Sequence, residues 1–408
     1  MLSHPEQLAR LLAACPEAAP AAVLAGDPCY DRLLAARPLR DRYRRAFGVR
    51  RGQRLVLLNS TWNPESLFGD GGPADVLPRL LPRLTAGLPA DEYRLAAVLH
   101  PNIWHGHGPG QLRLWLDRAA RAGLTLVDPL HDWRQALLAA DLVLGDFGSV
   151  TFYAAALGTP VLLGSAALDG LAPDSPVARF VGSAPVLDPD QPLLPQLESA
   201  LARPVPTAPA ALTSSAPGRS AALLRGHCYR LLDLPEPEAP ALLDPLPLPA
   251  HQPPVRTAPL TVLTWREPDG TLALRRFADL DGEPAEVPAH AHRHLAVHED
   301  TLDPSVLSLA DVIHRHGPAG DPRFGSPLEW AAEVLARYVG CALAAWVDTP
   351  HSCTVLTRDG LALRLTGTDA DPAAWASAVH AARADAAGGP TLRLGLTEHR
   401  VTVSALTP

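Results

Sequence analysis

The chain contains no lysine, so all 35 of its Lys and Arg positions are arginines. Isoleucine and asparagine are nearly absent as well, whereas alanine, leucine and proline are abundant. This bias is typical of codon usage in a GC-rich bacterial genome, so the arginines alone do not indicate phosphate chemistry. Because 43 Asp and Glu residues outnumber them and no basic patch occurs, the charge pattern argues against a nucleic-acid partner.

Cysteine and long apolar runs are also scarce. No C-x-x-C pair occurs, which favours buried thiols in a reducing cytoplasm over a disulfide or zinc framework. No apolar run reaches the roughly 18 residues of a membrane-spanning helix, and the first residues lack the pattern of a signal peptide. We therefore expect a cytoplasmic protein without a transmembrane segment, for which peripheral membrane association stays open. The cysteines are Cys15, Cys29, Cys228, Cys341 and Cys353.

Three common catalytic motifs are missing. No Gly-x-Ser-x-Gly, Walker-type or Gly-x-Gly-x-x-Gly sequence stands where a strand would require it. This argues against serine hydrolases and P-loop enzymes. We expect no cofactor and no metal.

The most informative stretch that is present spans residues 141–164. An apolar run at 142–144 predicts a buried parallel strand, and Gly158 and Pro160 mark the end of a helix and the start of a second strand. Between them, Asp146, Gly148 and Ser149 place a carboxylate, a residue without a side chain and a hydroxyl at a helix start. Such helix starts bind anions, above all phosphates. An ordinary βαβ turn with a serine N-cap explains the segment equally well.

Strands and helices alternate through residues 26–235. This alternation predicts an α/β fold, a Rossmann-like, doubly wound parallel sheet. The ends of the first, second and fourth strands carry polar residues, and ligands bind beyond the carboxyl ends of such strands. The sequence therefore predicts a ligand site there. The expected strands are 54–59, 93–99, 124–127, 142–144, 160–164 and a sixth at 184–187, and the expected helices include 75–86, 111–122, 132–140 and 219–232.

The rest of the chain divides by composition. Residues 1–25 read as a remnant or the end of a preceding domain, and 236–260 as a proline-rich linker. Residues 261–408 predict a smaller α+β domain of unassigned function. Two Asp-Gly turns, at 269–270 and 359–360, predict hairpins, and helices are expected at 327–339 and 372–387, with strands at 392–396 and 401–405.

Four short motifs of residues 26–235 occur together in one architecture. They are Asp146-Phe147-Gly148-Ser149, His100-Pro101, Ser60-Thr61-Trp62 and Gly158-Thr159-Pro160. Over residues 20–235 the chain resembles the donor-binding, C-terminal half of GT-B glycosyltransferases, nearest to CDP-glycerol glycerophosphotransferase-like proteins of wall and capsule polymer synthesis. The UDP-N-acetylglucosamine 2-epimerase family shares the sheet and the Gly-x-Pro sequence that joins the helix to the next strand.

The resemblance implies a transferase that moves a glycosyl or glycerophosphoryl group from a CDP- or UDP-linked donor to a polymer or lipid-linked acceptor. His100 is the candidate catalytic residue. Two departures stand out: Gly148 replaces a serine, and Tyr153 stands near where an acidic residue often binds the ribose. The residues implied in binding the donor diphosphate are Ser60, Thr61, His100, Asp146, Gly148, Ser149, Val150 and Thr151.

Enzymes of this architecture carry an acceptor-side domain before the donor domain, and only about 25 residues precede it here. A non-catalytic binding or regulatory module with a degenerate donor domain is therefore an alternative. A sugar-nucleotide epimerase-like enzyme is a second alternative.

Histidines outside this site suggest metal binding less strongly. His105 and His107 stand in a Gly/Pro-rich segment that predicts a mobile loop closing over the donor. His290, His292 and His294 alternate, with His298 close by, so a strand would place the first three on one face. A solvated histidine-rich loop is the competing interpretation. The pattern recurs at His314 and His316.

Overall fold

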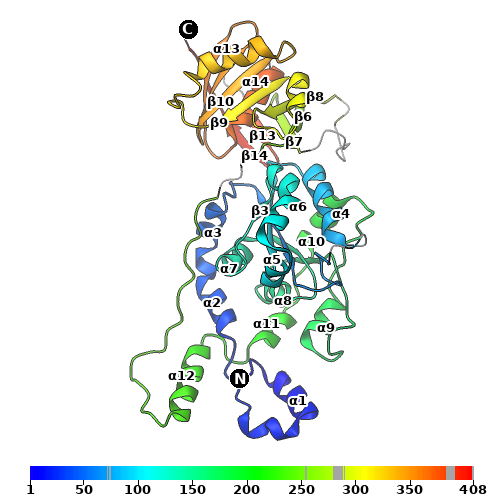
Figure 1. The fold of residues 1–408 in the computed structure, drawn as a ribbon, viewed down its shortest axis with the longest axis vertical. Helices are drawn as coiled ribbons and strands as arrows, with labels where there is room; N and C mark the ends of the chain where they lie inside the picture. Colours follow the sequence, from blue (N-terminus) through cyan, green and yellow to red (C-terminus); the bar gives the residue numbers. More distant parts are fainter. Residues whose placement is uncertain are drawn as a thin grey trace.

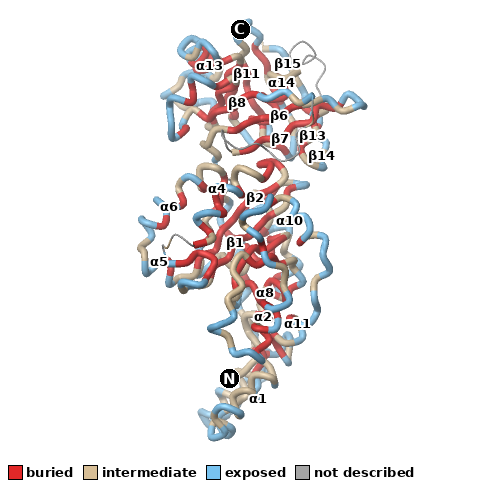
Figure 2. Tube along the Cα trace, turned by 90° about the vertical axis from the view of Figure 1, so that its right-hand side faces the viewer, coloured by how far each residue is buried: buried red, intermediate tan, exposed pale blue. Residues whose placement is uncertain are grey.

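The structure is a computed structural model that describes residues 1–70, 72, 75–252, 255–278, 288, 290–382 and 391–406. Two β-sheets, each flanked by helices, stack along the long axis of the molecule (Figure 1). The sheet nearer the N-terminus belongs to the blue-to-green part of the chain and the other to the yellow-to-red part. Buried segments run through both sheets (Figure 2).

The first sheet is parallel and five-stranded, in the order β3-β2-β1-β4-β5. The carboxyl ends of its strands therefore lie along one edge, with β1 between β2 and β4. The predicted sixth strand is wrong: Val186 forms only an isolated bridge with Leu163, because Pro185 lacks the N–H that a longer ladder needs. The strands are β1 (Arg54–Ser60), β2 (Tyr93–Leu99), β3 (Thr125–Leu126), β4 (Leu142–Gly145) and β5 (Val161–Leu163).

Helices cover both faces of this sheet. Leu55 and Leu57 of β1 enter one apolar core, whereas Val56 and Leu58 enter the other. The apolar run of β1 is explained by this double covering, and the predicted doubly wound α/β arrangement is observed. The first core is closed by α2 (Pro28–Ala36), α3 (Arg40–Ala46), α7 (Trp133–Ala139), α8 (Ser149–Ala156) and α9 (Pro176–Val181), the second by α4 (Val76–Gly87), α5 (Pro101–His107), α6 (Pro109–Arg121) and α10 (Leu193–Ala202).

The segment that holds His105 and His107 is helix α5, so the predicted loop is wrong. The His100 side chain accepts a hydrogen bond from the Asn102 N–H, and Pro101 occupies the first helical position. A capping side chain followed by proline is a helix start, and this signal outweighs the glycines further on.

Three further helices, α1 (Pro5–Ala14), α11 (Ala208–Thr213) and α12 (Ser220–Leu231), lie near the end of the molecule that is remote from the second sheet (Figure 1). The described residues between α12 and the second sheet form no helix or strand. They run along α2 and α3: Arg32 donates to the Asp244 carbonyl, Tyr43 donates to that of Leu246, and the Leu246 side chain is buried in the first core.

The second sheet has ten strands in the order β14-β13-β7-β6-β8-β9-β10-β11-β12-β15. Both predicted Asp-Gly hairpins are confirmed, since β6 pairs with β7 and β11 with β12, each antiparallel. The sheet is mixed, because β8, β9 and β10 run parallel. Its strands are β6 (Leu260–Arg266), β7 (Leu272–Phe277), β8 (His292–His298), β9 (Val312–His316), β10 (Leu343–Thr349), β11 (Ser352–Thr357), β12 (Ala362–Thr366), β13 (Thr391–Leu394), β14 (Thr397–Arg400) and β15 (Thr402–Ala405).

One helix covers each face of this sheet. Helix α13 (Pro327–Arg337) closes a core with Trp346, and α14 (Pro372–Ala382) closes the opposite core with Trp375. The last residues predicted for the second helix, 383–387, lie outside the described residues. No helix in the described part of the chain is long and apolar enough to cross a membrane.

A buried ion-pair network joins the two sheets. Arg276 of β7 contacts Asp91, which precedes β2, through Nε at 2.8 Å and Nη2 at 2.6 Å, and it also reaches Asp371 at 2.8 Å. Arg275 contacts Glu92 at 2.8 Å. Because Arg276 is 1% exposed, these contacts hold the two sheets together without competition from water.

Candidate functional site

The turn after β4 is fixed by Asp146. Its Oδ2 accepts the backbone N–H groups of Thr61 at 2.8 Å and Leu67 at 3.1 Å, and its Oδ1 accepts that of Gly148 at 2.9 Å. Burial raises the pKa of Asp146, and these hydrogen bonds oppose that shift. The carboxylate ties the loop after β1 to the start of α8, so it orders the site and has little capacity left for a ligand.

Ser60 and Thr151 belong to the same framework. The Ser60 hydroxyl accepts the Phe68 N–H at 2.9 Å, and the Thr151 hydroxyl accepts from Asn59 at 3.1 Å. Both side chains are buried. Among the predicted diphosphate-binding residues, these two hydroxyls therefore face the protein interior.

The start of α8 is open. Ser149 is exposed, and within the described residues no partner is found for the N–H groups of Ser149, Val150 and Thr151. The N-cap is Gly148, which has no side chain to cap them. A Cβ at Gly148 would lie 3.0 Å from Thr61 Cβ and 3.0 Å from Asp146 Oδ1. Close packing of the β1 loop thus explains the glycine, and its absence of a side chain leaves these donors uncapped.

His100 stands at the end of β2, next to β1. Its N–H donates to the Ser60 carbonyl at 3.0 Å, and its ring lies 6.3 Å from that of Trp62. Because Nδ1 accepts the Asn102 N–H, the neutral ring carries its proton on Nε2. Burial lowers the pKa of His100, so at neutral pH it presents a neutral N–H donor.

The structure thus brings the ends of β1, β2 and β4 together at one edge, with Thr61, His100, Ser149 and the N–H groups of Ser149 and Val150 as its ligand-accessible polar groups. Val150 is half-buried and packs against the first core. The fixed donors and the positive end of the α8 dipole suit an anion.

Two polar pairs near this edge escaped the sequence analysis. Tyr153 of α8 donates its hydroxyl to Asp27 at 2.7 Å, and burial raises the pKa of Tyr153. Asp128, just after β3, lies 3.2 Å from His131 Nδ1. The Asp27-Pro28 helix start is visible in the sequence, but nothing local shows that it meets α8.

The histidines of the second sheet gather differently from the predicted set. His290 and His292 are exposed, whereas His294 is buried with its ring 4.7 Å from that of His380. His298, His314 and His316 lie with their ring centroids 5.3 to 5.6 Å apart. Among the described residues, no group of three or more His, Cys, Asp or Glu is placed to hold a metal ion.

Comparison with known proteins gives one kind of match. No family model and no curated protein matches the chain. The chain is similar over half its length to the wall teichoic acid polymerase TagF. One TagF variant structure shares 15% sequence identity with this chain at a TM-score of 0.33, and the match covers 52% of this chain and 52% of the TagF chain. A TagF variant soaked with CDPG shares 15% sequence identity with this chain at a TM-score of 0.29, and the match covers 52% of this chain and 50% of the TagF chain.

The chain therefore spans about half the length of the TagF structures that it matches.

Proposed function

We propose that the carboxyl edge of the first sheet binds the diphosphate of a nucleotide-linked donor, as in the glycerophosphotransferase-like family that the motifs resemble. The observation that carries the proposal is the uncapped start of α8. The N–H groups of Ser149 and Val150 and the Ser149 hydroxyl stand there without partners in the described chain, and His100 lies across the loop of β1. These are hydrogen-bond donors preorganised for an anion.

In this proposal the chain supports transfer of a glycerophosphoryl or glycosyl group to a polymer acceptor. As the acceptor hydroxyl forms the new bond, negative charge develops on the phosphate that leaves with the nucleoside: a nucleoside diphosphate leaves in glycosyl transfer, and a nucleoside monophosphate leaves in glycerophosphoryl transfer, where the diphosphate linkage itself is cleaved. The N–H groups of α8, the positive end of its dipole and the His100 Nε2–H stabilise that charge. The Tyr153–Asp27 pair lies one turn further along α8, where its carboxylate is suited to the hydroxyls of a ribose. The sheet would then supply the GT-B-type donor half.

A thermal-shift screen tests the proposal. The purified chain is melted with CDP, UDP, GDP and ADP and with CDP-glycerol and UDP-sugars. A ligand present at about 100 times its Kd adds about 2.7 kcal/mol of stability, which a melt resolves. We expect one base to give a shift, and we expect Ser149→Ala to weaken that ligand by about 5- to 150-fold, equivalent to about 1–3 kcal/mol.

Ser404→Ala is the matched control, because it removes an exposed serine hydroxyl from β15 of the other sheet. Wild-type affinity in that variant together with a loss in Ser149→Ala supports the site. No shift with any nucleotide from folded protein, or equal affinity in Ser149→Ala, refutes it.

A further inference from the structure

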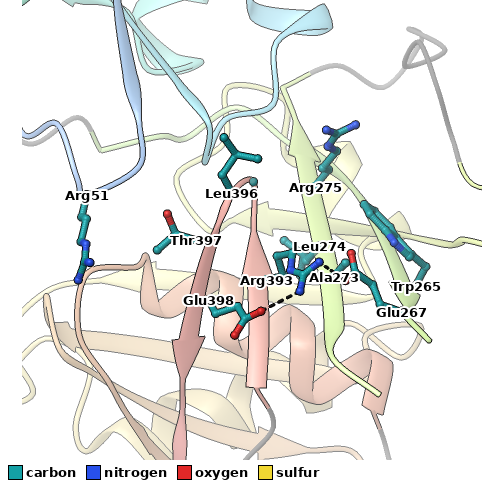
Figure 3. A pocket seen from close by; sticks show the side chains of 11 residues that line it. Arg51, Trp265, Glu267, Ala273, Leu274, Arg275, Arg393, Leu396, Thr397 and Glu398 are labelled. Carbon is teal, nitrogen blue, oxygen red and sulfur yellow. Dashed lines mark hydrogen bonds and ion pairs between the residues drawn. The ribbon is translucent and has the colours of Figure 1, made fainter. Parts of the chain in front are cut away.

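A cavity of about 690 Å³ lies on the second sheet, away from the edge described above. Figure 3 shows its side chains: Arg393, Glu398 and Glu267 meet in the middle, Trp265 lies on one side and Arg51 on the other. Its size is within the range of small-molecule sites.

The cavity floor is a single row across four strands. Glu398 of β14 pairs with Arg393 of β13, Arg393 with Ala273 of β7, and Ala273 with Trp265 of β6. Neighbouring strands are about 4.8 Å apart, so Arg393 and Trp265 stand roughly 10 Å from each other with the small Ala273 between them. The large side chains therefore form two walls, and Ala273, which is 1% exposed, lies at the bottom between them.

This row lies on the sheet face that α14 does not cover. Leu272, Leu274 and Leu392 are direct chain neighbours of residues in this row, so their side chains point to the opposite face of the sheet, where they enter the core beneath α14. The other face is covered by α13, which packs over β10 and β11. The row lies beside α13 rather than under it, and the cavity opens to solvent.

Every charged side chain that lines the cavity, except that of Arg51, is ion-paired. Arg393 forms ion pairs with Glu267 and, at 2.7 Å, with Glu398. Arg275 is paired with Glu92. Among the described lining residues Arg51 alone is an unpaired cation, fewer than a phosphate chain would need, while the ion pairs hold several planar donors and acceptors in fixed positions.

Trp265 supplies the aromatic surface of the cavity. Its ring is half-buried and stacks on no other aromatic ring among the described residues. An aromatic face attracts the polarised C–H groups of a sugar ring, and fixed Arg–Glu pairs match the donors and acceptors of neighbouring hydroxyls.

We propose that this cavity binds a neutral saccharide chain, stacked on Trp265 and hydrogen-bonded to Arg393 and Glu398. Arg51 lies between α3 and β1, is exposed on the side of the cavity opposite Trp265, and makes no ion pair within the described residues. It can therefore donate to a further sugar hydroxyl. The binding site is independent of the donor site, and it gives the second sheet a role in holding a glycan.

The experiment uses the full chain on a broad glycan array, followed by calorimetry with the strongest oligosaccharide. We expect Trp265→Ala and Arg393→Gln each to weaken that binding at least tenfold. The matched controls are Trp115→Ala and Arg323→Gln, which alter an exposed tryptophan and an exposed ion-paired arginine elsewhere and keep wild-type affinity. Arg51→Ala, an exposed position, gives a third test if either main variant fails to fold.

Three outcomes overturn the proposal. The first is wild-type protein that binds no glycan. The second is binding that Trp265→Ala or Arg51→Ala leaves unchanged. The third is binding only to a glycerol-phosphate oligomer with a steep loss at high salt, which would make the cavity a polyanion site instead.

Discussion

Replacing Arg276 with methionine tests the ion-pair network between the two sheets. Methionine keeps much of the volume of arginine but removes the cation that Asp91 and Asp371 share. The Arg276 side chain is 1% exposed and that of Asp91 is 4% exposed, so water cannot solvate the carboxylate once the arginine is removed. Breaking a buried pair of this kind costs about 3–5 kcal/mol, because a charge is left uncompensated.

Such a loss lowers the melting temperature of the second sheet by on the order of 10 °C. The effect of pH distinguishes this mechanism from a packing defect. Burial alone would raise the pKa of Asp91, and Arg276 holds it below its usual range; the pKa of Asp371 is lowered well below its usual range in the same way. In the wild type these two carboxyls thus bind fewer protons when folded than when unfolded, and stability falls on acidification.

Without Arg276, burial raises the pKa values of both carboxyls relative to those in the wild type. The folded variant then takes up protons at a higher pH than the folded wild type, so these two carboxyls contribute a smaller loss of stability on acidification below about pH 5. The fall in stability with acid is therefore shallower than in the wild type.

Thermal and urea melts at several pH values measure both quantities. Arg323→Met is the control, because that arginine pairs with Asp321 on the surface and is 76% exposed; surface pairs of this kind contribute little to stability. An Arg276→Met protein that melts with the wild type, or that loses stability on acidification as steeply as the wild type does, refutes the reasoning.

Three further predictions concern smaller features. His100→Asn keeps a good N-cap for α5 but removes the Nε2 donor, so stability should hold while donor affinity falls in calorimetry; equal affinity would contradict a role for His100. A Cβ at Gly145 would lie 2.3 Å from Thr151 Oγ1, so Gly145→Ala should lower the free energy of unfolding by about 1–3 kcal/mol in urea melts. Adding Thr151→Ala should recover part of that loss, and additive losses in the double variant would contradict the clash. Burial lowers the pKa of His298 to about 4, and that of His314 well below its usual value. Imidazoles in the unfolded chain have a pKa of about 6.5. Because the buried imidazoles stay neutral, the free energy of unfolding falls as the pH drops from about 6.5 toward 4. His298→Phe should reduce the slope of stability against pH, and an unchanged slope would contradict this explanation.

Local signals in the sequence were enough to predict the site framework. Asp146, Gly148 and Ser149 carry their own turn chemistry, and the alternating apolar runs give the parallel sheet. Asp146 accepts three backbone N–H groups, which is a common use of a carboxylate at a helix start. The two Asp-Gly hairpins were equally readable, because turn and strands adjoin in the sequence.

Features that depend on distant pairing could not be predicted. The histidine cluster forms because β8 pairs with β9 in parallel, which brings His298 beside His314, and no local pattern encodes that register. Asp91 and Arg276 are likewise joined only by the docking of the two sheets. The interior positions of Ser60 and Thr151 follow from the packing of the β1 loop against α8, which composition does not reveal.

We propose that the start of α8 holds a diphosphate. Calorimetric titration with CDP and CMP, and with UDP and UMP, isolates this contact, because each pair differs by one phosphate. We expect the diphosphate of the preferred base to bind more tightly than the monophosphate, and Ser149→Ala to remove most of this difference. Equal affinity for the two members of the pair, or a difference that survives in Ser149→Ala, would contradict it.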